Sequence, residues 1–212
     1  MSKTARTTRG TSNRARSRAQ AVAYRHRRLW FGGIGATIIV AVAAVVLGLH
    51  FANRPSSSTA SSAPDVGQVA PNGTFMTLAG KSVDVTSSRG QPTLLWFVST
   101  WCSSCQAGTQ TVAQNITTLL SDGVRVDEIE LYNDLGQSGP SMAQFSQALA
   151  GPQAANPDWT FGVSSQPLTR AYDPQSFLDI YYLLDSAGRV TYVNSSPGAT
   201  MAQLLAAARR VA

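Results

Sequence analysis

The longest uninterrupted apolar stretch of this 212-residue chain lies close to its start. Residues 29–49 contain no charged side chain, and at about 1.5 Å per helical residue they span roughly 30 Å, the thickness of the hydrocarbon core of a bilayer. Aromatic residues border the stretch at both ends, as interfacial anchors do. The pattern predicts a transmembrane helix over residues 29–51. A cleavable signal peptide is the alternative, but its apolar core is usually only about 7–15 residues long.

A folded domain is predicted over residues 67–212, after a Ser/Ala/Pro-rich linker over residues 52–66. Apolar and polar residues alternate over 82–86, which predicts a half-buried strand. Residues 93–99 form an apolar run, which predicts a central strand covered on both faces. A helical spacing of apolar positions follows over residues 102–120.

The rest of the domain alternates between strand and helix patterns: a strand over 124–131, a helix over 140–150, a hairpin of 181–184 and 190–193, and a closing helix over 200–211. The strand at 124–131 should be parallel to the one at 93–99, because a helix connects them. This order predicts an α/β sandwich with a mixed central sheet flanked by helices. Trp96 and Phe97 are expected in the core, and Glu128 and Glu130 in solvent.

Charge divides the chain into two unlike parts, so the net charge of +6 is an average. Residues 1–28 contain nine basic residues and no acidic one, which predicts a disordered basic tail. Residues 52–212 contain eight basic and eleven acidic residues. By the positive-inside rule, the tail is cytoplasmic and the folded domain is extracytoplasmic. The basic tail alone could suggest nucleic acid, but the adjacent apolar stretch favours the lipid bilayer as the partner, and no nucleic acid is expected.

The chain has only two cysteines, Cys102 and Cys105, and they lie between the predicted central strand and the following helix. Thiols three residues apart at a helix start can form a Cys102–Cys105 disulfide, and the helix N-terminus stabilises a thiolate at Cys102. Such a small loop makes the disulfide a poor structural brace. Both histidines precede residue 51, and zinc needs four ligands. The pattern therefore favours a redox dithiol with no metal and no cofactor, in a compartment where disulfides persist.

The dithiol between a strand and a helix resembles the thioredoxin fold, and the surrounding sequence resembles the TlpA/ResA-like membrane-anchored thiol-disulfide oxidoreductases. The resemblance covers roughly residues 67–212 and rests on these segments: Ala70-Pro71, Gly80-Lys81, Arg89-Gly90-Gln91-Pro92, Phe97-Val98-Ser99-Thr100-Trp101-Cys102 and the hairpin 183–190. It implies a thioredoxin-like sandwich in which Cys102 attacks and Cys105 resolves the mixed disulfide. Trp101, Ser103 and Ser104 would support this site. The implied partners are cysteine-containing exported proteins and a membrane redox partner.

Three positions depart from the pattern of this family. Trp96 stands where thioredoxins carry a buried carboxylate, six residues before the first cysteine. Gly108 stands where the TlpA/ResA branch often has a glutamate, three residues after the second cysteine. The expected cis-proline position holds Asp179 or Ile180. These departures leave open how the proton of the resolving thiol is controlled.

Other functions remain as alternatives to a single-pass membrane oxidoreductase. A Sco-like copper-delivery module would use CxxxC and a histidine, whereas this chain has CxxC and Ile180 at the corresponding position. A peroxiredoxin-like peroxidase would need a proline at Leu95. A redox-inactive binding domain would agree with the missing proline. The two serines between the cysteines do not indicate the direction of electron flow.

Overall fold

The computed structural model describes residues 62–211. The predicted basic tail, the predicted transmembrane helix and most of the predicted linker therefore lie outside the described residues. Among residues 62–211, no helix is both long and apolar enough to span a bilayer.

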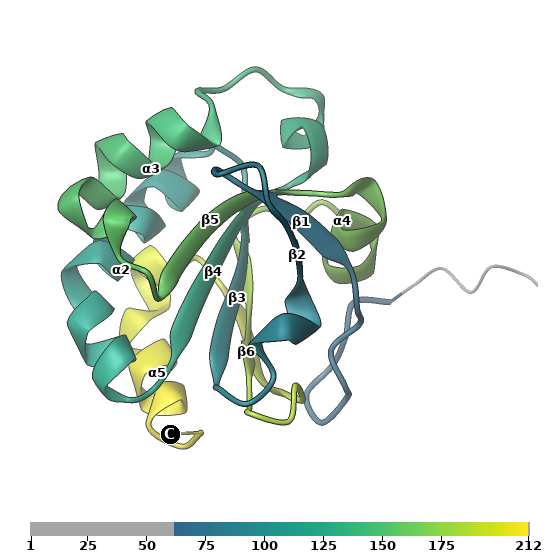
Figure 1. Cartoon of the computed structure of the whole chain (residues 1–212), viewed down its shortest axis with the longest axis vertical. Coiled ribbons are helices and arrows are strands. Elements are labelled where there is room, and N and C mark those ends of the chain that lie inside the picture. Colours follow the sequence, from purple (N-terminus) through teal and green to yellow (C-terminus); the bar gives the residue numbers. More distant parts are fainter. Residues whose placement is uncertain (1–61, 212) are drawn as a thin grey trace, which may run out of the picture. The chain divides into compact units, whose positions relative to one another are not determined.

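The described domain is built on one seven-stranded mixed sheet (Figure 1). Its strands, in the order β2-β1-β5-β4-β3-β6-β7, are β2 (Ser82–Asp84), β1 (Thr74–Thr77), β5 (Trp159–Ser164), β4 (Arg125–Glu130), β3 (Thr93–Val98), β6 (Ile180–Leu184) and β7 (Val190–Ser195). The three central strands β3, β4 and β5 are parallel, and the outer strands are antiparallel to their neighbours. The predicted parallel pairing of the two apolar strands is confirmed.

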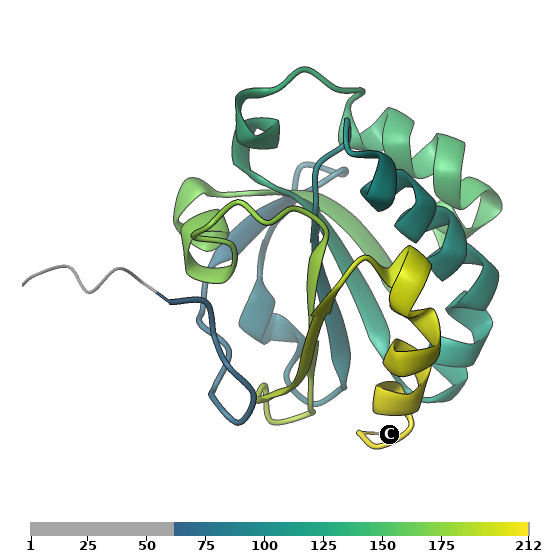
Figure 2. The ribbon, with the colours of Figure 1, turned by 180° about the vertical axis from the view of Figure 1, so that it is seen from behind.

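Helices cover both faces of the sheet (Figures 1 and 2). One face carries α2 (Ser103–Ser121), α3 (Met142–Ala150) and α5 (Pro197–Ala208). The other face carries α4 (Gln166–Tyr172) and the N-terminal part of the domain. Every residue of β3 is buried, because its alternate side chains point into two separate apolar clusters. Trp96 faces α2, and Phe97 faces α4, so the prediction that both are core residues is confirmed.

The sequence pattern missed three elements of the sheet and its cover. Strand β1, strand β5 and helix α4 were not predicted, so the mixed sheet is larger than the pattern indicated. β5 follows Pro157 and contains Gly162, and both residues mask a strand pattern. Gly162 is needed there, because a Cβ would lie 2.5 Å from Cδ2 of Phe75 on β1. The predicted hairpin is confirmed as β6 and β7.

Candidate active site

The two cysteines lie where β3 ends and α2 begins, at the carboxyl end of the parallel strands. Cys102 is the N-cap residue of α2, and its amide donates to the carbonyl of Ser99 at 3.1 Å. The carbonyl of Cys102 accepts from the amide of Gln106 at 3.0 Å, which is the first helical hydrogen bond. The strand thus delivers Cys102 directly to the positive end of a 19-residue helix.

Both thiols are free, and they differ in access. Cys102 is 8% exposed and Cys105 is fully buried. The Cys105 sulfur accepts a hydrogen bond from the amide of Ser99 at 3.4 Å. Burial, and next the charge of Asp179, raises the pKa of the Cys105 thiol far above its ordinary value. Both thiols are therefore buried, but Cys102 at the helix N-terminus keeps some contact with solvent, whereas Cys105 keeps none.

The predicted supporting residues take different places. The Ser104 Oγ lies 3.0 Å from the Cys102 sulfur. Ser103 is the exposed first residue of α2. Trp101 is 37% exposed beside Cys102, and its indole N–H donates to the carbonyl of Asp134 at 2.9 Å. Trp101 and Ser104 are therefore brought to the dithiol, whereas Ser103 faces solvent.

Asp134, which sequence reasoning missed, holds Thr100 in place, two residues before Cys102. It lies in the loop after β4 and is 6% exposed. Its Oδ1 accepts from the Thr100 amide at 2.9 Å, and its Oδ2 accepts from the Thr100 hydroxyl at 2.6 Å. Gly139 packs so closely on this pair that a Cβ there would collide with both Thr100 Oγ1 and Asp134 Oδ2. An acidic residue in a predicted loop gave no signal of this role.

The three departures from the family pattern form one connected group. Trp96 is fully buried, and its indole N–H donates to Oδ1 of Asp179 at 2.9 Å. A Cβ at Gly108 would lie 2.7 Å from Cζ2 of Trp96, so the indole fits only because position 108 is glycine. These three positions therefore depend on one another. The Trp96 indole on β3 needs the space left by Gly108 on α2, and it donates to Asp179 in the loop before β6.

Glu128 is a second buried acid near the dithiol, and the prediction that it is solvated is wrong. It is fully buried on β4, directly beside Trp96 in the strand register. Thr109 Oγ1 lies 2.6 Å from Glu128 Oε1 and 3.0 Å from the carbonyl oxygen of Cys105. Burial raises the pKa of Glu128 to about 8, so the carboxyl is mostly protonated at neutral pH. The strand next to a doubly covered strand is itself covered, and this was the signal that could have found Glu128.

Glu130 also departs from the prediction of a solvated side chain, although less than Glu128. It is half-buried at the carboxyl end of β4. Burial, and next the charge of Asp134, raises the pKa of Glu130 to about 7. The pKa values of Glu128 and Glu130 on β4 are therefore both raised above those of free carboxyls.

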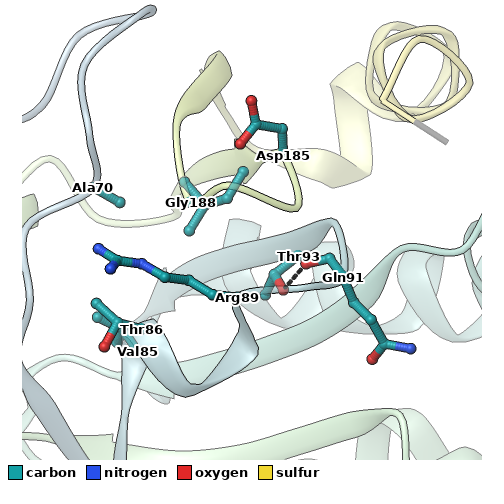
Figure 3. Close-up of a pocket in the computed structure, with 9 residues that line it drawn as sticks. Ala70, Val85, Thr86, Arg89, Gln91, Thr93, Asp185 and Gly188 are labelled. Atoms are coloured by element: carbon teal, nitrogen blue, oxygen red, sulfur yellow. Dashed lines mark hydrogen bonds between the residues drawn. The ribbon is translucent and has the colours of Figure 1, made fainter.

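A small pocket lies at the end of the sheet opposite the dithiol (Figure 3). It is a cavity of about 10 Å³ between the loop before β3 and the β6–β7 hairpin, with space for about one water. In Figure 3, Arg89 extends between Thr86 and Gly188. A Cβ at Gly188 would lie 3.1 Å from Arg89 Nε. The Arg89 side chain is therefore packed closely against the β6–β7 hairpin.

Metal binding finds no support in the donors that the described residues bring together. Among residues 62–211 there is no group of three or more His, Cys, Asp or Glu side chains that could hold a metal ion. Both histidines of the chain lie outside this range, at positions 26 and 50. Cys102 and Cys105 supply two thiols, and no third His, Cys, Asp or Glu joins them among residues 62–211 to complete a tetrahedral zinc site.

No family model and no curated protein matches the sequence. Solved structures do match the fold. A thiol:disulfide interchange protein of the thioredoxin family from Chlorobium tepidum aligns with a TM-score of 0.50 at 17% identity, over 71% of this chain and 99% of that one. The thioredoxin domain of a thiol-disulfide oxidoreductase from Bacteroides vulgatus aligns with a TM-score of 0.50 at 17% identity, over 66% and 98%. Copper-bound ScoI from Arabidopsis thaliana aligns with a TM-score of 0.50 at 14% identity, over 68% and 99%.

These similarities establish the fold of the described domain. It is a thioredoxin-like α/β sandwich with a central mixed sheet, as the sequence predicted. At identities below 20% they do not transfer an activity, and the matched structures include both disulfide-exchange proteins and a copper-bound protein. Function must therefore be argued from the residues around the two cysteines.

Proposed function

We propose that this chain is a membrane-anchored thiol-disulfide oxidoreductase whose extracytoplasmic domain exchanges disulfides with exported proteins. The observation that carries the proposal is the arrangement of the two thiols. Cys102, 8% exposed at the N-terminus of α2, keeps some contact with solvent, and Cys105 is fully buried one turn further along the helix. A reachable attacking thiol and a sealed resolving thiol are what stepwise disulfide exchange requires.

The exchange would proceed in two displacements at sulfur. The Cys102 thiolate attacks one sulfur of a partner disulfide, a mixed disulfide forms, and the other partner sulfur leaves as a thiolate. Cys105 then loses its proton and attacks the Cys102 sulfur, which releases the second partner thiolate and closes the Cys102–Cys105 disulfide. The partner gains two electrons and the domain loses two. The same steps run backwards against a reduced partner, and the relative reduction potentials set the direction.

A membrane redox partner would restore the starting state of the dithiol after each cycle. The uncharged stretch 29–49 and the basic tail 1–28 support an anchor with the domain outside the cytoplasm. In that compartment disulfides persist, so exported proteins with cysteines are the expected substrates.

Trapping in cells tests the proposed chemistry. A full-length Cys105→Ser variant should accumulate mixed disulfides with exported proteins, because nothing resolves them. The matched Cys102→Ser variant should accumulate almost none, because its remaining thiol is buried. Non-reducing gels and mass spectrometry of the trapped species give the result and identify the substrates. Equal trapping by both variants, or none by either together with no exchange against a model disulfide, would contradict the proposal.

Fractionation tests the proposed location. The full-length chain should remain with membranes in high salt and in carbonate, and protease added to intact spheroplasts should digest the C-terminal domain. A shortened soluble form would favour a cleaved signal peptide. A domain that resists protease until the cells are opened would reverse the orientation.

Copper delivery is the less favoured function. The structural similarity to ScoI concerns the fold alone, and residues 62–211 contain no histidine and no three-ligand group. Copper titration of the reduced full-length chain separates the two functions, since tight binding of one copper(I) ion would favour delivery.

A further inference from the structure

The resolving step raises a problem that the dithiol alone does not solve. Cys105 is fully buried, and burial raises the pKa of its thiol far above the ordinary value. It must nevertheless become a thiolate to attack the Cys102 sulfur. Water cannot take the proton easily at a site that solvent does not reach. A base inside the domain is therefore required, and the two family positions for one hold Trp96 and Gly108.

Asp179 is a buried acid that faces this thiol from the loop before β6. It is 2% exposed, and its Oδ1 accepts the indole N–H of Trp96 at 2.9 Å. Its Oδ2 is buried and has no hydrogen-bond partner among the described residues. Its charge is the second largest influence on the Cys105 thiol. One carboxylate oxygen is thus held in place by Trp96, while the other has no hydrogen-bond partner among the described residues.

The same carboxyl is linked to Cys102 through a serine. The hydroxyls of Ser104 and Ser196 lie close enough to stabilise the ionised form of Asp179, although burial outweighs them and raises its pKa. Ser104 Oγ in turn lies 3.0 Å from the Cys102 sulfur. Asp179 therefore acts on Cys105 through its charge and lies near Cys102 by way of Ser104.

The backbone around Asp179 is held in an unfavourable conformation. Leu178 and Asp179 have φ values of 56° and 53°, in the left-handed region that favours glycine. The amide of Ser196, which itself has a φ of 52°, donates to the Asp179 carbonyl at 2.9 Å. Such conformations persist only where surrounding contacts impose them, and they concentrate at functional sites. Here the strained residues Leu178 and Asp179 place the Asp179 carboxyl near the dithiol.

Resting on the proposed function, we propose that Asp179 is the internal base of the resolving step. The proton of the Cys105 thiol moves to the Asp179 carboxylate as the Cys105 sulfur attacks the Cys102 sulfur. The Cys102–partner bond breaks, the partner sulfur leaves with its electron pair, and the Cys102–Cys105 bond forms. The proton then passes from Asp179 to solvent or to the departing thiolate. In the reverse direction Asp179 returns a proton to Cys105.

Other titratable groups face Asp179 from the elements packed around it, and they are weaker candidates. Cys105 comes from α2, Glu128 from β4 and Tyr181 from β6. Glu128 contacts the backbone of Cys105 only through Thr109, and it does not act directly on the Cys105 thiol. The Tyr181 hydroxyl lies 2.8 Å from Thr200 Oγ1 on α5. Asp179 alone combines burial, a free oxygen and a direct influence on Cys105.

A two-phase reaction of the reduced full-length chain with 5,5′-dithiobis(2-nitrobenzoate) tests the proposal. Attack by Cys102 releases the first thionitrobenzoate at a rate proportional to reagent concentration. Attack by Cys105 on the resulting mixed disulfide releases the second at a rate independent of reagent. Asp179→Asn keeps an oxygen that can accept from Trp96 but cannot take a proton. It should slow the second phase by about 100-fold, the low end for loss of a general base, while the first phase persists.

The pH profile separates a base from a merely structural residue. In the wild type, the rate of the second phase should rise with pH and level off once Asp179 is ionised. In Asp179→Asn it should keep rising in proportion to hydroxide, because only ionisation of Cys105 remains. The matched control is Asp173→Asn, another buried loop carboxyl, whose Oδ1 accepts from the Phe177 amide at 2.7 Å. This control should keep the plateau.

A second variant decides the matter if Asp179→Asn does not fold. Trp96→Phe removes the N–H that stabilises the ionised carboxyl, so the plateau should begin at a higher pH. An unshifted plateau, or a plateau kept in Asp179→Asn and lost in Glu128→Gln, would overturn the assignment to Asp179 while leaving the oxidoreductase proposal intact. A wild-type chain that never releases the second thionitrobenzoate would overturn both.

Discussion

The two ends of the sheet turn the chain with different residues. At the end away from the cysteines, Gly90, Gly123 and Gly188 take positive φ values of 105°, 73° and 76°. At the cysteine end, the turn after β4 also has one such glycine, Gly136 at 81°, but the turns after β4 and before β6 place several non-glycine residues in the left-handed region. These are Asn133, Asp134, Leu135, Ser176, Leu178 and Asp179. Each such residue costs about 1 kcal/mol or more, whereas glycine adopts the conformation freely.

The difference has a physical reason in the side chains. Asp134 holds Thr100 through two hydrogen bonds, and Asp179 receives the indole N–H of Trp96. Glycine at either position would relax the backbone and remove the carboxyl. At the opposite end no side chain is required at Gly123, where a Cβ would meet nothing within 4 Å. At the cysteine end, backbone strain therefore lowers stability but fixes the positions of acidic side chains. Variants at both ends test this comparison, from the largest expected effect to the smallest.

The largest expected effect is on the pH dependence of stability, through Glu128. Its pKa is about 8 in the folded domain, above the ordinary value of 4.5 that the unfolded chain should show. Between these values the folded state holds a proton that the unfolded state has released, so stability is greatest below about 4.5 and falls as pH rises toward 8. The loss is on the order of a few kcal/mol. Glu128→Gln should remove this contribution of Glu128 to the decline. Urea unfolding of the full chain at pH 8 should therefore show that the variant is more stable than the wild type.

A matched control for this prediction lies at the opposite end of β4. Asp158 is half-exposed and forms an ion pair of 3.6 Å with Arg125. Asp158→Asn should leave the decline of stability between pH 5 and pH 8 in place, because exposed pairs contribute only about 0–1 kcal/mol. An unchanged decline in Glu128→Gln would mean that the buried acid is not the cause.

Removing Asp134 should have the next largest effect. Asp134→Ala leaves the amide and hydroxyl of Thr100 buried without their acceptor, which should cost about 2–3 kcal/mol of unfolding free energy. The segment before Cys102 should also loosen, so the rate of attack by Cys102 on a model disulfide should change. Asp134→Asn retains hydrogen bonding to Thr100 and should show less than half of the loss. Equal losses in the two variants would show that charge, rather than hydrogen bonding, fastens the segment.

Gly108→Ala tests the close fit between α2 and Trp96. Its Cβ would lie 2.7 Å from Cζ2 of Trp96 and 3.2 Å from Cγ of Pro197. Overpacking of this kind should cost about 1–3 kcal/mol, although alanine favours the helix by about 1 kcal/mol. In a double-mutant cycle, Trp96→Phe should relieve most of the cost, because the smaller ring leaves room. Additive losses would show that the two positions do not depend on each other.

The path from strand to dithiol to helix was predictable because it follows from local sequence. The apolar run into Phe97, the cysteine spacing and the helical period over 102–120 are each determined by neighbouring residues. The β5 strand was missed because Pro157 and Gly162 argue against a strand locally, and only its pairing with β4 and β1 stabilises it. Long-range pairing overrode local preference there.

The acids of the site could not be predicted for a related reason. Asp134 and Asp179 stand in loops, where acidic residues are usually solvated, and their partners Thr100 and Trp96 lie 34 and 83 residues away in the sequence. Trp96 and Gly108 were recognised as departures from a family pattern. That they fit each other, and that Asp179 completes the fit, became evident only from the packing of α2 on β3.

The smallest expected effect compares one left-handed residue from each end. Ser176 is exposed at a φ of 55°, so Ser176→Gly relieves backbone strain without removing a buried contact. The relief exceeds the extra entropy that glycine gains in the unfolded chain, and the variant should be a few tenths of a kcal/mol more stable. Gly123→Ala, at a φ of 73° and with open space around its Cβ, should lose about 1 kcal/mol. Urea unfolding of the two full-length variants beside the wild type measures both shifts. If Ser176→Gly were instead destabilised as much as Gly123→Ala, the left-handed loop before β6 would carry no strain, and the proposed contrast between the two ends would fail for that loop.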